Sequence, residues 1–310
     1  MKRKLLLLLP LLALLLGGCA RPAESQKLQV VAAIFPEYDW VRQLTAGDDS
    51  LELTLLVDDG LDPHSFQPSV KDMVAVSQCD LLVFGGGESD EWLEELLREP
   101  SNPSQQVVEL LPLLGETAHQ AETVDGMQVR EAEDETDEHV WLSLRNAQRF
   151  CTAITDSLCA LNPGNTALYR ANLAKYLEQL EALDESYRET VQAGRLDTIV
   201  VCDRFPFRYL VEDYGLKYYA AFPGCSAEAG ASFETVVFLA ERARELRVNA
   251  LLVTESSDGR LANTVAENSG GHAAVLTLNS MQSVSADTAK DSSYLSVMEQ
   301  NCQVLEQALG

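Results

Sequence analysis

Short apolar runs alternate with helical patterns along most of this 310-residue chain, and that alternation constrains the fold more than any other feature. A first set of strand-length runs is followed, after a long helical stretch, by a second set. The runs are almost continuously apolar, which is typical of parallel strands buried on both faces. We therefore predict an α/β protein with two lobes, each a mostly parallel four-stranded sheet with flanking helices. The predicted strands are Leu28–Phe35, Leu51–Val57, Asp80–Phe84, Val107–Leu110, Thr198–Cys202, Lys217–Phe222, Ala250–Thr254 and Ala274–Leu278.

A long helical pattern lies between the two sets of strands. It opens at Asn162-Pro163, a suitable N-cap and first-turn pair, and ends at Gly194. A helix from Asn165 to Ala193 would be roughly 43 Å long, which is more than one lobe needs for packing. We predict a rigid linking helix over residues 164–194 between an N-terminal lobe (28–163) and a C-terminal lobe (195–310). Such a stiff connection predicts small lobe motions, with ligand capture governed by local loops.

The N-terminus has the pattern of an export signal. A basic start, Lys2 to Lys4, precedes the apolar run Leu5–Leu16 and the small residues before Cys19. The run is too short for a comfortable membrane span. Its Leu-Gly-Gly-Cys ending resembles a bacterial lipoprotein signal, which implies a signal peptide at 1–18, a lipidated Cys19 and a polar tether over 19–27. The alternative is an ordinary signal with an incidental cysteine.

The chain is strongly acidic. It has 23 Lys and Arg against 48 Asp and Glu, a formal net charge of −25. This charge argues against nucleic acid and anionic membrane surfaces as partners, and it is compatible with cations. Part of it lies in Gly115–Glu138, a long acidic loop of the kind that is usually functional or disordered.

The cysteines beyond Cys19 do not reveal a pairing. Export would permit disulfides, yet no CxxC zinc spacing occurs, and the residues are Cys79, Cys151, Cys159, Cys202, Cys225 and Cys302. Cys151 and Cys159 would lie too far apart along one helix to bridge. Cys202 and Cys225 each follow a predicted strand and could meet, but buried free thiols are the alternative.

Polar residues follow several of the predicted strands at their carboxyl ends, where ligands bind in open parallel sheets. Two imidazoles from the first lobe would face carboxylate and amide oxygens from the second, a donor set suited to zinc or manganese. One histidine lies in the proline-stiffened loop LDPHSFQPS, which pre-aims it. Each residue alone has a simpler interpretation: a solvated or core histidine, a helix cap, a partner of a histidine, or a turn. The candidate ligands are His64, His139, Asp203, Glu255 and Asn279.

Two segments carry a resemblance to a known family. GLDPHSFQPSVKD and DEHVWLSLRNA resemble the paired histidine motifs of the zinc/manganese-binding solute-binding lipoproteins of ABC metal importers, the cluster A-I metal-binding family. The likeness extends over residues 28–309, and in that family each segment supplies one metal-binding histidine. The resemblance implies a monomer that is not an enzyme and is lipid-anchored to the outer face of the bacterial cell membrane. It would pass Zn²⁺, or alternatively Mn²⁺, to an ABC permease and its ATPase.

The chain departs from this family pattern at the third and fourth ligands. Arg204 stands where the family has a histidine or glutamate, and Asp203 could substitute if the loop DRFPFRY carries an extra residue. Asn279 stands where an aspartate is typical, and Glu255 or Cys225 could fill a gap. Two other functions stay open: an adhesin lipoprotein whose metal is only structural, and a metallohydrolase, although no HExxH motif is present.

Overall fold

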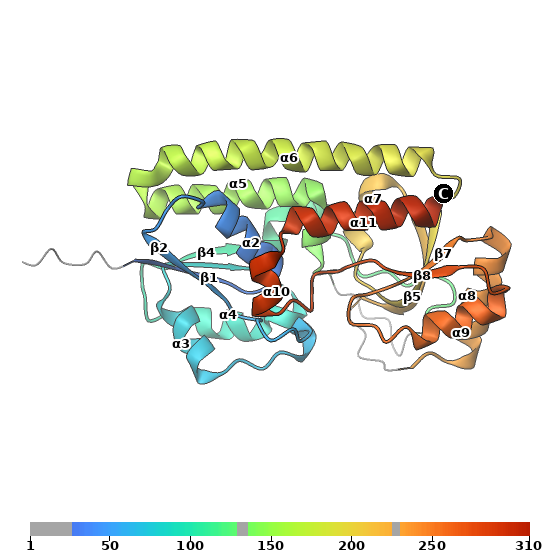
Figure 1. Ribbon diagram of the computed structural model, residues 1–310. Coiled ribbons are helices and arrows are strands. Elements are labelled where there is room, and N and C mark those ends of the chain that lie inside the picture. The colour runs from blue at the N-terminus through green and yellow to red at the C-terminus, as the bar shows by residue number, and fades with distance from the viewer. Residues whose placement is uncertain (1–26, 129–135, 225–229) are drawn as a thin grey trace, which may run out of the picture.

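The computed structural model describes residues 27–128, 136–224 and 230–310. It contains a four-stranded parallel sheet in each half of the chain (Figure 1). The strand order is β2-β1-β3-β4 in the first sheet and β6-β5-β7-β8 in the second. Helices flank both sheets, so the predicted two-lobed α/β architecture is confirmed.

The N-terminal sheet is buried on both faces because its strands are apolar on both sides. Val30, Leu81 and Val83 share one core with Trp40 and Phe150 from two helices on that face. The alternate residues, such as Leu82, share a second core with side chains from the helices on the other face. The elements of this lobe are β1 (Leu28–Ala32), α2 (Phe35–Leu44), β2 (Leu51–Leu55), α3 (Val70–Gln78), β3 (Leu81–Phe84), α4 (Glu91–Leu97), β4 (Gln106–Glu109) and α5 (Leu144–Leu161).

The C-terminal sheet is likewise buried on both faces. Val200, Leu251 and Leu239 form a core with the helices on one face, whereas Val201 and Leu252 face the helices on the other. The elements of this lobe are β5 (Thr198–Phe205), α7 (Arg208–Tyr214), β6 (Lys217–Pro223), α8 (Phe233–Leu246), β7 (Ala250–Val253), α9 (Arg260–Ser269), β8 (Ala274–Thr277), α10 (Ala286–Asp291) and α11 (Tyr294–Leu309).

The predicted long helix is α6 (Thr166–Ala193), 28 residues in length. It runs along both lobes beside α5 and α11 (Figure 1), and it packs against α2, α5, α7 and α11. One stripe of its surface is buried against them: Tyr169, Leu173, Tyr176, Leu180, Leu183, Asp184 and Tyr187. The linking helix therefore belongs to the hydrophobic cores of both halves, and the exact lobe boundaries stay predictions.

The ends of the first strand and of β5 differ most from the sequence prediction. The first strand ends at Ala32 instead of Phe35, because α2 already begins at Phe35. The Glu37 carboxylate accepts a hydrogen bond from the Ile34 amide at 3.0 Å and caps this helix start. Strand β5 continues past Cys202 to Phe205, with an irregular register between Val201 and Arg204. Arg204 consequently pairs with Phe222 inside the sheet and does not lie in a loop.

Several predictions concern residues that are wholly or partly outside the described ranges. Cys19, Cys225 and part of the acidic loop fall there. The other cysteines, Cys79, Cys151, Cys159, Cys202 and Cys302, are free thiols. Within the described ranges, every helix falls short, in length or in apolar character, of what crossing a bilayer requires.

Candidate metal centre

His64 lies in a single helical turn, η1 (Pro63–Ser65), that its neighbours hold in place. Asp62 caps this turn, because its Oδ1 atom accepts from the His64 backbone N–H at 3.1 Å. The Ser89 hydroxyl lies 3.0 Å from His64 Nδ1 and donates its single hydrogen to Glu138, so Nδ1 is the donor to Ser89. His64 Nε2 is buried without a hydrogen-bond partner. Burial also lowers the pKa of His64, which favours a neutral ring whose Nε2 lone pair is available.

His139 is fully buried and is oriented by Asp137. One carboxylate oxygen, Asp137 Oδ1, lies 2.9 Å from the backbone N and 3.0 Å from Nδ1 of His139. Burial acts to lower the pKa of His139, but the Asp137 carboxylate outweighs it and the pKa lies above the usual value. Tyr209 donates to the Asp137 carbonyl at 3.0 Å and fixes this turn against the C-terminal lobe. Asp137 therefore holds Nδ1 as the donor and leaves Nε2 available to a ligand.

Glu138 completes a group of three potential ligands. Its Oε1 atom lies 3.4 Å from His64 Nε2, and its Oε2 atom accepts from the Ser89 N–H at 3.0 Å. One ligand atom from each of His64, Glu138 and His139 lies within 4.8 Å of the others. Gly87 permits this approach, since a Cβ there would be 2.7 Å from Glu138 Cβ. Tetrahedral zinc holds its ligand atoms about 3.3 Å apart, so a small side-chain movement would bring these three atoms to zinc-binding distance.

The C-terminal lobe presents Gln282 to this group. Gln282 is buried, and its Nε2 atom lies 3.2 Å from His139 Nε2. Glu255 holds the loop that carries it, because the Glu255 carboxylate accepts from the backbone N–H groups of Ser280 at 2.8 Å, Gln282 at 3.0 Å and Ser283 at 3.2 Å. Ser280 Oγ lies 2.9 Å from Glu255 Oε1 and 3.1 Å from Gln282 Oε1. The Gln282 amide therefore lies against His139 at the edge of the centre. A rotation of the amide group would turn its oxygen toward a bound ion.

The remaining predicted ligands use their oxygens elsewhere. Asp203 accepts from the Arg204 N–H at 2.8 Å and from Thr254 Oγ1 at 2.8 Å, which ties β5 to the end of β7. Asn279 accepts from the Met281 N–H at 2.8 Å and forms a turn. The structure thus brings His64 and His139 together, and it gives Asp203, Glu255 and Asn279 contacts that organise loops around them.

Arg204 also reaches the centre, from the C-terminal lobe. Its Nη2 atom lies 2.5 Å from Asp62 Oδ2, so an ion pair spans the two lobes directly beside the His64 turn. Both side chains are largely buried. This ion pair explains how an arginine is accommodated at the position where the family pattern has a metal ligand.

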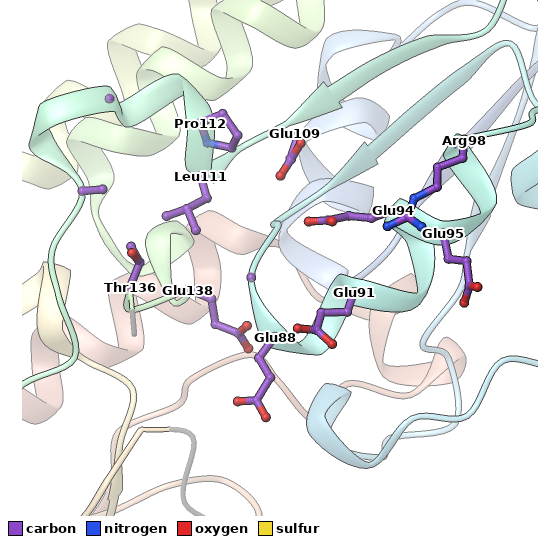
Figure 2. A pocket seen from close by; sticks show the side chains of 13 residues that line it. Glu88, Glu91, Glu94, Glu95, Arg98, Glu109, Leu111, Pro112, Thr136 and Glu138 are labelled. Carbon is purple, nitrogen blue, oxygen red and sulfur yellow. The ribbon is translucent and has the colours of Figure 1, made fainter. Parts of the chain in front are cut away.

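A strongly acidic cavity borders the centre on the side of Glu138 (Figure 2). Its volume is about 850 Å³, and Arg98 is the cationic residue among those that line it. The glutamates of the wall are Glu88, Glu91, Glu94, Glu95, Glu109 and Glu138. Such a wall raises the local concentration of cations. Together with two imidazoles and a buried carboxylate, it makes this region suited to a divalent cation.

Comparison with known proteins identifies relatives over nearly the whole chain. A family model described as "Zinc-uptake complex component A periplasmic" matches residues 30–308. The zinc-binding lipoprotein AdcA of Streptococcus pneumoniae is 30% identical over 313 aligned positions, which cover 99% of this chain and 61% of AdcA. The high-affinity zinc uptake system protein ZnuA of Bacillus subtilis is 25% identical, covering 93% of this chain and 89% of that protein. This chain therefore spans about three fifths of the length of AdcA.

The solved structures agree with the sequence relatives. The Zn(II)-bound ZnuA-like domain of Streptococcus pneumoniae AdcA superposes with a TM-score of 0.73 at 27% identity. The superposition covers 91% of this chain and 99% of that domain. The two-lobed chain is thus similar to the ZnuA-like part of AdcA.

Proposed function

Because the chain belongs to the family of periplasmic zinc-uptake components A, we propose that it is the extracytoplasmic solute-binding component of an ABC metal importer. It captures a divalent cation between its lobes, zinc in the first place and manganese in the second, and delivers it to a membrane permease driven by an ATPase. A lipid on Cys19 anchors the monomer to the outer face of the cell membrane. Family membership favours this function over the adhesin and the metallohydrolase.

The observation that carries the proposal is the arrangement of His64, Glu138 and His139, whose ligand atoms lie within 4.8 Å of one another. Two imidazole nitrogens and one carboxylate oxygen form a donor set that suits zinc. In our proposal these three residues bind the ion from the N-terminal lobe, and Gln282 adds its amide oxygen from the C-terminal lobe. Asp137, Glu255 and Ser89 orient the ligands, as outer-shell residues do in metal sites.

Manganese stays the second candidate for a chemical reason. Carboxylate and amide oxygens suit it, but neutral imidazoles suit zinc, and zinc binds more strongly than manganese to most nitrogen and oxygen sites. With two of the donors being histidines, the centre favours zinc. The acidic cavity would attract either ion.

The test is the metal content and affinity of residues 20–310, purified without a histidine tag. We expect one zinc per chain in a competition titration against a chromophoric chelator. The variant His64→Ala should lose about 100-fold or more in affinity, since even outer-shell changes cost 10- to 100-fold. His272→Ala, which removes an exposed histidine, is the matched control. Little bound metal in the wild type, or equal affinity in His64→Ala, would contradict the proposal.

A further inference from the structure

Arg204 carries a positive charge into a centre that is otherwise built to receive a cation. The extended strand β5 places this residue opposite Phe222, and its guanidinium crosses to the N-terminal lobe. There Nη2 lies 2.5 Å from Asp62 Oδ2, with only 21% of the arginine side chain and 14% of the aspartate side chain exposed. Ion pairs buried to this degree are screened less than surface pairs, so this charge is felt at the site.

Asp62 is the residue that Arg204 restrains. One of its oxygens accepts from the His64 N–H, and the other is held by Arg204. The negative charge of Asp62 acts electrostatically on both imidazoles. Asp62 therefore lies beside both histidines, but both of its oxygens are already engaged. The His64 backbone N–H holds one, and the Arg204 guanidinium holds the other.

We propose that Arg204 is an affinity-determining residue, which lowers the affinity of the centre by acting as a resident cation. Its ion pair with Asp62 cancels one negative charge next to the histidines and keeps that carboxylate away from a bound ion. The inference rests on the proposed function and extends it. A binding protein that must surrender its ion benefits from such a restraint, because tighter binding slows release.

The experiment is a charge-balanced cycle of variants measured for zinc affinity by chelator competition at one pH and salt concentration. Arg204→Gln should bind zinc about 10- to 100-fold more tightly, since the site becomes more negative by one unit and Asp62 is released. Arg208→Gln is the matched control: Arg208 makes the same charge change, but it pairs with Glu122 and Glu212. Its affinity should stay within about threefold of the wild type.

The second half of the cycle tests Asp62 itself. Asp62→Asn keeps a side-chain oxygen that can cap the His64 turn, yet leaves Arg204 uncompensated. Its zinc affinity should fall about 10-fold or more. The double variant, with both Asp62→Asn and Arg204→Gln, has the wild-type net charge. It should not show the higher zinc affinity of Arg204→Gln alone. The melting temperature of each metal-free variant shows whether the fold is kept.

The possible outcomes separate this inference from the proposed function. Unchanged or weaker zinc binding in folded Arg204→Gln would overturn the inference while the wild-type site stands. A gain that persists in the double variant would show that Asp62 is not the restrained group and would also overturn it. If neither the wild type nor Arg204→Gln binds zinc, the proposed function fails together with the inference. If only the variant binds zinc, the inference holds and the zinc assignment of the native protein does not.

Discussion

At the scale of single residues, Asp137 determines the orientation of the His139 ring and which of its nitrogens can bind a metal. One carboxylate oxygen lies 2.9 Å from the backbone N and 3.0 Å from the ring Nδ1, so the other ring nitrogen is left for a metal. Asp137→Asn removes the charge that supports this arrangement. We expect zinc affinity to fall about 10- to 100-fold, as for other outer-shell partners of metal-binding histidines. Competition titration measures it, and Asp258→Asn, at an exposed aspartate paired with Arg260, is the control. An affinity within threefold of the wild type would refute this role.

Gln282 leads to a second prediction at this scale. As an amide it donates toward His139 Nε2 and offers a neutral oxygen, whereas a glutamate would offer a charged one. Gln282→Glu should therefore bind zinc about 10-fold more tightly. It should also lower the melting temperature of the metal-free protein, because a new carboxylate is buried near Glu255. The control is Gln307→Glu at an exposed position. Weaker zinc binding in a folded Gln282→Glu variant would exclude Gln282 from the ion's coordination.

These residues show how far sequence reasoning reaches at a site. The sequence predicted His64 and His139, since both stand in motifs with prolines or apolar neighbours that fix a turn. It did not predict Glu138, although that residue directly precedes His139, because spacing alone does not tell which way a side chain turns. Gln282 carries no charge and lies in a segment without a distinctive pattern, so no local feature indicated it. These placements depend on contacts between segments far apart in the chain.

At the scale of elements, apolar composition predicted where strands occur better than where they end. Burial of side chains on both faces is a property of the run of residues, so each sheet strand could be found. The ends depend on tertiary contacts: the extension of β5 through Arg204 follows from its pairing with Phe222 in β6. That extension moved Arg204 from a predicted loop to a rigid strand, and so it determined which residue reaches across to Asp62.

The start of α4 provides a prediction about pH. Asp90 lies at this helix N-terminus and accepts from the Gly86 N–H at 3.0 Å, and burial raises its pKa to about 7. A raised pKa means that the folded protein favours the protonated form. The resulting stabilisation is complete below the unfolded pKa of about 3.9 and is lost as the pH rises through about 7, at up to about 4 kcal/mol.

Asp90→Asn stays neutral at every pH and should escape this loss. We expect it to be more stable than the wild type at pH 8 by roughly 1–4 kcal/mol, with the difference shrinking toward pH 4. Urea unfolding at both pH values measures the effect. Asp287→Asn, at an aspartate whose side chain is 95% exposed, should show no such pH-dependent gain. A variant that is less stable than the wild type by the same amount at both pH values would show that the carboxyl group matters for packing and not for its charge.

At the scale of the whole molecule, contacts between the lobes are numerous around the centre. Trp141 donates through Nε1 to the Ser280 carbonyl at 2.9 Å, and Tyr294 donates through its hydroxyl to the Trp141 carbonyl at 2.7 Å. The Tyr294 backbone N–H in turn donates to Asp39 Oδ2 at 2.7 Å. These contacts join α2, the His139 segment and α11, and both α2 and α11 pack against α6, which spans both halves (Figure 1). A wide hinge opening would break several buried hydrogen bonds, each of which would leave polar groups unpaired.

Because the lobes should move little, we predict that metal binding changes the structure only in the loops around the centre. Hydrogen exchange with and without zinc should show new protection in the ligand loops, residues 62–66, 137–142 and 280–283. It should show little change in α6, whose exchange should already be slow because its buried stripe packs against four other helices, α2, α5, α7 and α11. The same comparison in His64→Ala controls for non-specific effects of zinc and should show no loop protection. If α6 and the loops changed equally on zinc binding, the helix would be part of the moving structure. The rigid connection between the lobes would then be the wrong description of how the ion is captured and released.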